Sequence, residues 1–227
     1  MEPRTATPQD TAPAEMSATV LEFYDRALTF VQANYYDRLD YYRGLRFTDT
    51  TPDLFWAEYT WVVYAAGFNS KVLDKKYPAL QEAYGHWLGV GPVRKKYVLA
   101  IIRREDKWKA CLQVANMMQG AARAKAIKDW WPAFQMTWLD TPEKLQALPW
   151  IGPVSCYHLA RNIGQDAVKP DLHLVRLAEH YGFCSPLRMC EYIRSNRQNE
   201  RLGVVDLVLF YACSTWGTLA IRRPGAR

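Results

Sequence analysis

The sequence predicts an all-α fold, and three observations support this prediction. Apolar residues recur three and four positions apart over long stretches, which is the period of a helix with one buried face. Capping residues, Pro and Gly mark the ends of these stretches. No segment alternates apolar and polar residues as a half-buried strand does. The chain has 227 residues, of which 49% are hydrophobic, so it can form one large core or two packed lobes.

The first half of the chain divides into a tail and a series of helices. Residues 1–17 are rich in Pro, Thr and Ala without an apolar period, which predicts a disordered tail. A helical pattern begins near Ala18. Residues 53–66 are apolar on most sides, so we expect a buried helix there. The turn at residues 67–70 ends it, and Ser70 is a candidate cap for the next helix, expected over residues 71–84.

The second half continues the helical pattern. We expect helices over residues 111–118 and 121–134, with Gly120 between them, and a further helix over residues 187–196. The apolar run that begins at residue 204 also fits a strand. A helix over residues 204–216 is favoured because the periodic pattern extends well beyond the length of a typical strand.

The charge balance is basic, with a net charge of +6 and a sequence pI near 9.0. The densest basic run contains Arg94, Lys95, Lys96, Arg103, Arg104, Lys107 and Lys109. Such a run is usually a solvated helix face. The alternative is an electrostatic footprint for DNA, whose phosphates attract clustered Lys and Arg.

The cysteines and the apolar runs bound the location of the protein and its cofactors. Five cysteines occur, no CxxC motif is present, and no signal peptide is recognised, so we expect a reduced, cytoplasmic protein. No apolar run approaches membrane-spanning length. Cys184 and Cys190 are too isolated to form an iron–sulfur ligand set, and the four His are scattered. We therefore expect no metal, no cofactor and no membrane partner.

A helix–turn–helix segment centred on residues 148–155 stands out. Thr141 is a good N-cap for a short first helix, and Pro149 disfavours helical backbone in the residue before it. Gly152 can supply the backbone freedom that a tight turn needs, and Pro153 can open the next helix. Gly164 is expected to end that helix. Backbone N–H groups in such a hairpin can bind phosphate without selecting a sequence, although an ordinary corner between two helices is an equally good interpretation.

Asp171 is the residue most suited to catalysis. Pro170 holds the chain extended before it and a helical pattern follows, so Asp171 is expected at a helix N-terminus, where the helix dipole favours a carboxylate. A carboxylate can stabilise a cationic sugar C1′ or deprotonate an attacking water, as in glycoside hydrolysis. By position alone, however, an Asp before a helix is more often only a cap.

Two sequence strings together resemble the signature of the helix-hairpin-helix DNA glycosylases. They are Leu148-Pro149-Trp150-Ile151-Gly152-Pro153 and Asp171-Leu172-His173-Leu174-Val175-Arg176, with 19 residues from Gly152 to Asp171. The resemblance covers residues 141–182 and suggests a divergent member. It implies a two-lobed helical fold with the active-site cleft between the lobes. Residues 18–66 and 169–227 would form the first lobe, and residues 67–168 the second, which carries the hairpin.

The resemblance also implies roles for individual residues. Asp171 matches the essential aspartate of the family. The implied DNA-binding residues are Trp150, Ile151, Gly152, Pro153, Val154 and Ser155 in the hairpin, with Phe68, Asn69 and Ser70 in the turn that fills the gap left by an extruded base. His173 and Arg176 match the positions just after the aspartate and are expected to support the backbone there. Lys169 is a further supporting candidate because it is close to Asp171 in sequence, although by itself it is typical of a solvated loop cation.

The chain departs from the family pattern at two hairpin positions. Trp150 stands where the family has its first hairpin Gly, so the turn is altered or Trp150 presses on the DNA. Val154 stands where bifunctional members carry a catalytic Lys, so a strand-cleaving Schiff-base mechanism is not expected there. The four-cysteine iron–sulfur loop of one branch of the family is absent from the sequence.

These observations favour a monomeric, monofunctional DNA glycosylase. It would bind double-stranded DNA, extrude a modified base and hydrolyse its glycosidic bond with Asp171. One alternative keeps the fold and changes the reaction, as in bacteriophage proteins thought to join an amine or amino acid to an activated 5-hydroxymethyluracil in DNA. A second alternative is a non-catalytic DNA-binding module that retains only the hairpin.

Overall fold

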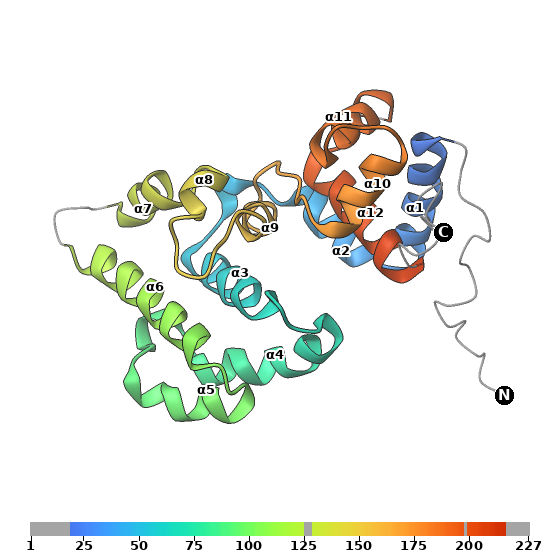
Figure 1. Cartoon of the computed structure of the whole chain (residues 1–227). Coiled ribbons are helices and arrows are strands. Elements are labelled where there is room, and N and C mark those ends of the chain that lie inside the picture. Colours follow the sequence, from blue (N-terminus) through green and yellow to red (C-terminus); the bar gives the residue numbers. More distant parts are fainter. Residues whose placement is uncertain (1–18, 125–128, 198, 217–227) are drawn as a thin grey trace. The chain divides into compact units, whose positions relative to one another are not determined.

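The computed structural model describes residues 19–124, 129–197 and 199–216 (Figure 1). Throughout these ranges the chain forms helices joined by turns, and no strand occurs in them. The predicted all-α class is therefore confirmed. The predicted tail at residues 1–17 lies outside the described residues.

The chain divides into two compact units. Unit 1 comprises the chain up to Leu45 and from Asp166 onward, and unit 2 comprises Arg46–Gln165. The predicted first lobe, residues 18–66, extends too far into unit 2. The physical reason is α3 (Pro52–Ala65), an apolar helix that packs against α4, α6 and α9 of unit 2. Its apolar surface is buried within that unit.

Unit 1 is organised around its last helix. The helices of this unit are α1 (Val20–Asn34), α2 (Tyr36–Gly44), α10 (Leu172–His180), α11 (Pro186–Asn196) and α12 (Leu202–Trp216). Helix α12 packs against the other four (Figure 1). It is apolar nearly all round and buried along most of its length, as a helix surrounded by others must be. The helix prediction for residues 204–216 is confirmed.

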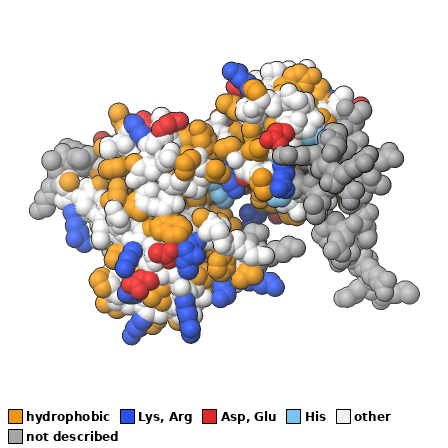
Figure 2. Space-filling view, viewed as in Figure 1, with side chains coloured by type: hydrophobic (Ala, Val, Ile, Leu, Met, Phe, Trp, Pro, Cys, Tyr) orange, Lys and Arg blue, Asp and Glu red, His pale blue; other side chains and the backbone are white. Residues whose placement is uncertain are grey.

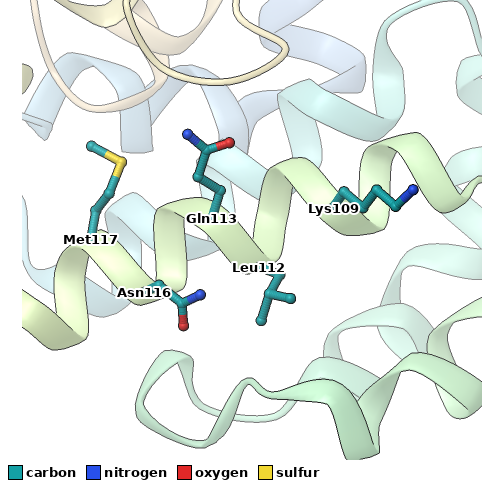
Figure 3. Close-up of a pocket in the computed structure, with 5 residues that line it drawn as sticks. All are labelled: Lys109, Leu112, Gln113, Asn116 and Met117. Carbon is teal, nitrogen blue, oxygen red and sulfur yellow. The ribbon is translucent and has the colours of Figure 1, made fainter.

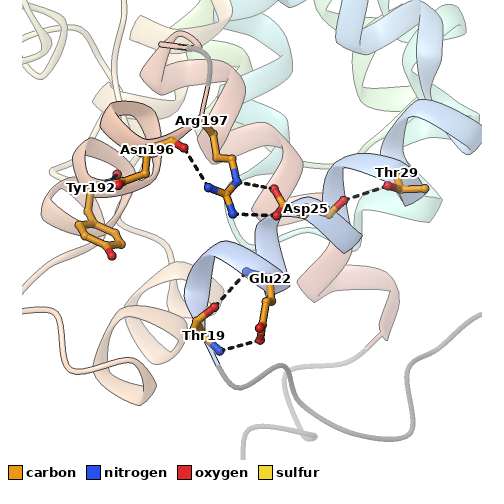
Figure 4. A network of polar contacts seen from close by, with 7 residues as sticks. All are labelled: Thr19, Glu22, Asp25, Thr29, Tyr192, Asn196 and Arg197. Carbon is orange, nitrogen blue, oxygen red and sulfur yellow. Dashed lines mark hydrogen bonds and ion pairs between the residues drawn. The ribbon is translucent and has the colours of Figure 1, made fainter.

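The N-terminal helix of unit 1 is fixed by polar contacts at its surface (Figure 4). Thr19 Oγ1 accepts a hydrogen bond from Glu22 N, and Glu22 Oε2 accepts one from Thr19 N, which together form a capping box. Further along α1, both carboxylate oxygens of Asp25 accept hydrogen bonds from the guanidinium of Arg197, at 2.7 and 2.9 Å. This bidentate pair joins α1 to the residue after α11.

Unit 2 carries the hairpin and the longest helix. Its elements are the 3₁₀ turns η2 (Phe47–Asp49), η3 (Trp87–Gly89) and η4 (Pro92–Arg94) and the helices α3 (Pro52–Ala65), α4 (Ser70–Tyr84), α5 (Lys95–Ile101), α6 (Glu105–Arg123), α7 (Trp130–Trp138), α8 (Pro142–Leu145) and α9 (Ser155–Asn162). Helix α6 continues through Gly120, so the break predicted there is wrong. The cost of one Gly within a helix is about 1 kcal/mol, which the packing of α6 on α3, α5 and α7 exceeds.

The C-terminal end of α9 is closed by Gly164, as predicted. Its φ angle is +87°, and Gln165 N donates to Ala160 O at 2.9 Å across the end of the helix. A Cβ atom on Gly164 would lie 2.6 Å from Phe47 N and close to the backbone of Arg46. Only glycine fits this position, because both its conformation and the space around it exclude a side chain.

Candidate functional site

The hairpin at residues 148–155 is held by buried side chains on its inner side. Leu148 and Ile151 are buried, and the hydroxyl of Tyr59 on α3 donates a hydrogen bond to Pro149 O at 2.8 Å. On the preceding short helix, Thr141 acts as the predicted N-cap and accepts a hydrogen bond from Lys144 N. The first half of the hairpin is therefore anchored to α3 and to the core of unit 2.

The backbone of the turn differs from the prediction. The residue with left-handed backbone is Trp150, at φ +64°, whereas Gly152 has no positive φ angle. The expectation that Gly152 supplies the conformational freedom of the turn is therefore wrong. A Cβ atom on Gly152 would meet only Ser155 Oγ, at 3.9 Å. The fold of the free protein thus has room for a side chain at Gly152.

The N-terminus of α9 presents backbone amides. Gly152 N donates to Ser155 Oγ at 2.7 Å, which fixes the turn. The N–H groups of Val154 and Ser155 donate no hydrogen bond to any residue that the structure describes. They are among the N–H groups that a helix leaves without intrahelical acceptors, and such groups can bind an anion. Pro153 and Val154 are exposed beside them.

The second predicted DNA contact, the turn after α3, also lies in unit 2. Gly67 has φ +69°, and Phe68 is half-buried. Asn69 caps α4 by accepting a hydrogen bond from Val72 N at 3.3 Å, so the predicted capping role of Ser70 is wrong. Ser70 is the first residue of α4, and its side chain lies outside the described residues.

Lys107 joins the hairpin to this turn and was not among the predicted site residues. Its buried ammonium donates hydrogen bonds to Tyr64 O at 3.1 Å and to Ala66 O at 2.7 Å, at the end of α3. The same Nζ atom lies 5.2 Å from the centre of the Trp150 ring. Burial, followed by the charge of Arg104, lowers the pKa of Lys107 to about 8.

The signal that could have identified Lys107 is its position in α6. It falls in the buried register of that helix, with Cys111, Val114 and Met118 at spacings of four, three and four residues. Because Lys107 belongs to a basic run, the sequence favours the interpretation that it lies on a solvated helix face.

Two neighbouring carboxylates neutralise part of the basic run. Glu105 pairs with Lys95 at 2.8 Å and with Lys109 at 3.5 Å, and Asp106 pairs with Arg104 at 2.7 Å. In Figure 2, acidic side chains lie among the basic ones on the lower part of the view, where α5 and α6 lie in Figure 1. The run therefore offers DNA a weaker electrostatic footprint than its sequence suggests.

Asp171 lies in unit 1, at the N-terminus of α10. Its Oδ1 accepts hydrogen bonds from His173 N at 3.0 Å and Leu174 N at 3.1 Å, so the predicted cap is confirmed. Its Oδ2 is buried and accepts no hydrogen bond within the described part of the chain. The nearest cation recorded for it is Lys169 Nζ, at 3.6 Å. Oδ1 of this carboxylate therefore caps α10, whereas Oδ2 has no hydrogen-bond donor within the described residues.

Lys169 is not a solvated loop cation, contrary to the interpretation from its sequence context. Its side chain is only 18% exposed, and its Nζ lies 5.4 Å from the centre of the Phe210 ring. The backbone N–H of Lys169 donates to Oδ2 of Asp206, a buried residue of α12, at 2.8 Å. Contacts with α12, which is distant in sequence, thus hold Lys169 beside Asp171.

The other residues around Asp171 have distinct environments. His173 is half-buried, with its ring edge-on to Phe210 at 6.0 Å, whereas Arg176 is exposed on α10. Cys213 lies on α12, and burial raises the pKa of its thiol to about 12, with a smaller contribution from the charge of Asp171. This thiol therefore stays protonated near neutral pH and is a poor nucleophile.

Two hollows in unit 2 are lined by residues other than the predicted ones. An open hollow of about 460 Å³ lies along α6, where Lys109, Leu112, Gln113, Asn116 and Met117 line it (Figure 3). A more enclosed hollow of about 270 Å³ lies between α3 and α4. Its lining includes Trp56, Tyr84, Asp53 and His86, and Asp53 Oδ1 lies 2.7 Å from His86 Nε2.

The described residues contain neither a metal-ligand cluster nor a membrane-spanning helix. Within the described ranges, no cluster of three or more His, Cys, Asp or Glu side chains is arranged to hold a metal ion. None of the described helices has the length and apolar character needed to span a bilayer.

Comparison with known proteins gives no relative. No protein-family model matches the chain, and no curated protein or solved structure matches it.

Proposed function

We propose that the chain is a DNA-binding enzyme that hydrolyses the N-glycosidic bond of a modified base extruded from duplex DNA, with Asp171 as the catalytic carboxylate. The observation that carries this proposal is the asymmetry of Asp171. Two backbone amides of α10 hold Oδ1, while buried Oδ2 accepts no hydrogen bond in the described part of the chain. A buried acceptor without a donor is costly, and a catalytic role is one of the reasons for which proteins keep such a group.

The geometry suits chemistry at a sugar C1′. The amides and the dipole of α10 favour a carboxylate at this position and fix its orientation. A fixed carboxylate stabilises a developing positive charge at C1′ without having to reorganise during the reaction. Alternatively, its second oxygen accepts a proton from the attacking water. Lys169, 3.6 Å away, compensates the charge of Asp171 when no substrate is bound.

The hairpin supports the DNA-binding part of the proposal. The amides of Val154 and Ser155, at the start of α9, are suited to a phosphate oxygen. Such a contact positions the duplex without reading bases. Access to C1′ and the base then requires extrusion of the nucleotide, for which the turn at Phe68 and Asn69 is the candidate wedge. The helix-hairpin-helix glycosylase fold is part of this proposal.

Mass spectrometry of DNA tests the proposal. Duplex oligonucleotides, each with one modified base, are incubated with the protein, and both the strands and the released bases are weighed. We expect a free base and an abasic strand for at least one modification. A strand that gains mass instead would favour the amine or amino-acid transferase, and an unchanged strand would favour the non-catalytic binding module.

The variant Asp171→Asn separates chemistry from folding. Asn also caps helices well, so we expect the variant to fold normally and to lose base release by about 100-fold or more. Asp25→Asn is the matched control, because it removes a surface carboxylate of unit 1 that pairs only with Arg197 in the contacts described above. Base release that survives in Asp171→Asn would overturn the catalytic role.

A further inference from the structure

We propose that Trp150 is a stacking platform for an unpaired nucleobase, next to the phosphate held by the hairpin amides. The inference rests on the proposed DNA binding and narrows its substrate to DNA with a locally unpaired base. Four observations carry it: the backbone conformation of Trp150, the exposure of its ring, the two cations beside it, and its place in the hairpin.

The backbone at Trp150 is strained. A φ angle of +64° is rare for a bulky residue and common for glycine, so glycine would form this turn at lower cost. Strained residues persist where the surrounding structure holds them, and they cluster at functional sites. We therefore expect the Trp150 side chain to have a role other than forming the turn.

The indole ring is exposed where a core tryptophan would be buried. Trp150 is 39% exposed, while its hairpin neighbours Leu148 and Ile151 are buried. Among the ring pairs of the described residues, none involves Trp150. The ring thus contributes little to the core and leaves aromatic surface open to a ligand.

Two cations from the start of α6 flank the ring. Lys107 Nζ lies 5.2 Å and Arg104 Cζ lies 5.4 Å from its centre. Arg104 is the residue just before α6 and Lys107 lies in its first turn, so both cations come from the N-terminal end of that helix. These contacts hold the indole in place, and the exposed part of its surface remains open to a partner. An aromatic ring bordered by Lys and Arg is the arrangement by which proteins bind unpaired bases.

The same hairpin offers a phosphate site. The amides of Val154 and Ser155 come four and five positions after Trp150 in the sequence. A phosphate on these amides and a base on the indole would belong to one strand, because a nucleotide places both groups close together. In a paired duplex each base is already stacked and is not available. The hairpin is therefore expected to favour a strand with an unpaired base.

Fluorescence anisotropy with two labelled 21-base-pair duplexes tests the inference. One duplex is fully paired, and the other has the same sequence with one extra, unpaired adenine at its centre. We expect the protein to bind the bulged duplex about tenfold more tightly. Trp150→Phe should retain most of this preference, since it keeps an aromatic face. Trp150→Gly should abolish the preference, so that this variant binds the two duplexes equally.

The controls distinguish this inference from the proposed function. Trp138→Ala removes a different, half-buried tryptophan of unit 2, on α7, and should leave the preference unchanged. Gly152→Asp should weaken binding of both duplexes equally, because it acts at the phosphate. Equal affinity of the wild-type protein for the two duplexes, or an unchanged preference in Trp150→Gly, overturns the stacking role while DNA binding still stands. Failure to bind either duplex overturns both.

Discussion

Lys107 Nζ lies 5.2 Å from the centre of the Trp150 ring and at the same time donates a 2.7 Å hydrogen bond to Ala66 O. One buried ammonium thereby connects the hairpin to the end of α3, just before the turn at Phe68. Lys107 thus contacts both of the segments that the sequence predicts to bind DNA. If binding of a phosphate displaced the hairpin, the movement would be transmitted through Lys107 to the turn at Phe68.

The first prediction concerns Lys107 and pH. Burial lowers the pKa of Lys107 from 10.5 to about 8, so between these values the unfolded chain binds more protons than the folded chain. The stability contributed by Lys107 therefore rises with pH over this window. We expect the free energy of unfolding of the wild type, minus that of Lys107→Met, to grow by at most ~1.4 kcal/mol per pH unit from pH 8 to pH 10.5.

Urea unfolding of the two proteins across this pH range measures the effect. The difference between the two unfolding free energies is used because buried thiols and phenols also titrate in this range. Their contributions are the same in both proteins and cancel in the difference. Lys109→Met is the matched control, since Lys109 is exposed on the same helix. A difference that stays constant with pH would show that Lys107 keeps its ordinary pKa.

The second prediction concerns two glycines with left-handed backbone. Gly164→Ala is expected to cost ~3 kcal/mol or more, because its Cβ would lie 2.6 Å from Phe47 N as well as strain the backbone. Gly67→Ala has φ +69° but open space, so it should cost only ~1 kcal/mol. Thermal and urea unfolding compare the two. Equal losses would mean that backbone strain alone, and not the close approach, sets the cost.

The third prediction concerns Asp171 as the N-cap of α10. Asp171→Ala removes the acceptor for His173 N and Leu174 N and should lower the free energy of unfolding by ~1 kcal/mol. Asp171→Asn and Asp171→Ser keep a cap and should stay within ~0.5 kcal/mol of the wild type. Ser185→Ala, at the N-cap of α11, is a reference for the loss of an ordinary cap. The cap would be dispensable if Asp171→Ala unfolded like the wild type.

The fourth prediction concerns Gly152. Because a Cβ there would meet only Ser155 Oγ at 3.9 Å, Gly152→Ala should change stability by less than ~0.5 kcal/mol. It should still weaken binding of duplex DNA about tenfold, because the added methyl group would occupy the approach of a phosphate. Gly89→Ala, in open space on η3, is the matched control. Unchanged DNA affinity in Gly152→Ala would argue against the hairpin as the phosphate site.

Local features of the fold could be predicted from the sequence, whereas features set by tertiary contacts could not. The caps at Thr141 and Asp171 and the stop at Gly164 depend on a few adjacent residues, and all three were predicted correctly. The length of α6 was not, because packing overrides the weak helix propensity of Gly120.

The candidate site shows the same division. The pairing of Lys169 with Asp171 depends on Asp206 of α12, 37 residues away in sequence, which holds the Lys169 backbone. The left-handed conformation of Trp150 depends on the anchors of the hairpin, and the burial of Lys107 on the end of α3. In each case the environment of the residue is set by a partner that is distant in sequence.

The close approach of Gly164 to the backbone of Arg46 and Phe47 has a consequence for the design of shorter chains. Unit 2 begins at Arg46 and ends at Gln165, so its first and last residues are neighbours. A segment whose ends meet can be inserted, excised or re-joined with little loop-closure entropy. Residues 46–165 should accept a short linker between their ends and new termini in an exposed turn, which would allow the hairpin to be studied in a circularly permuted domain.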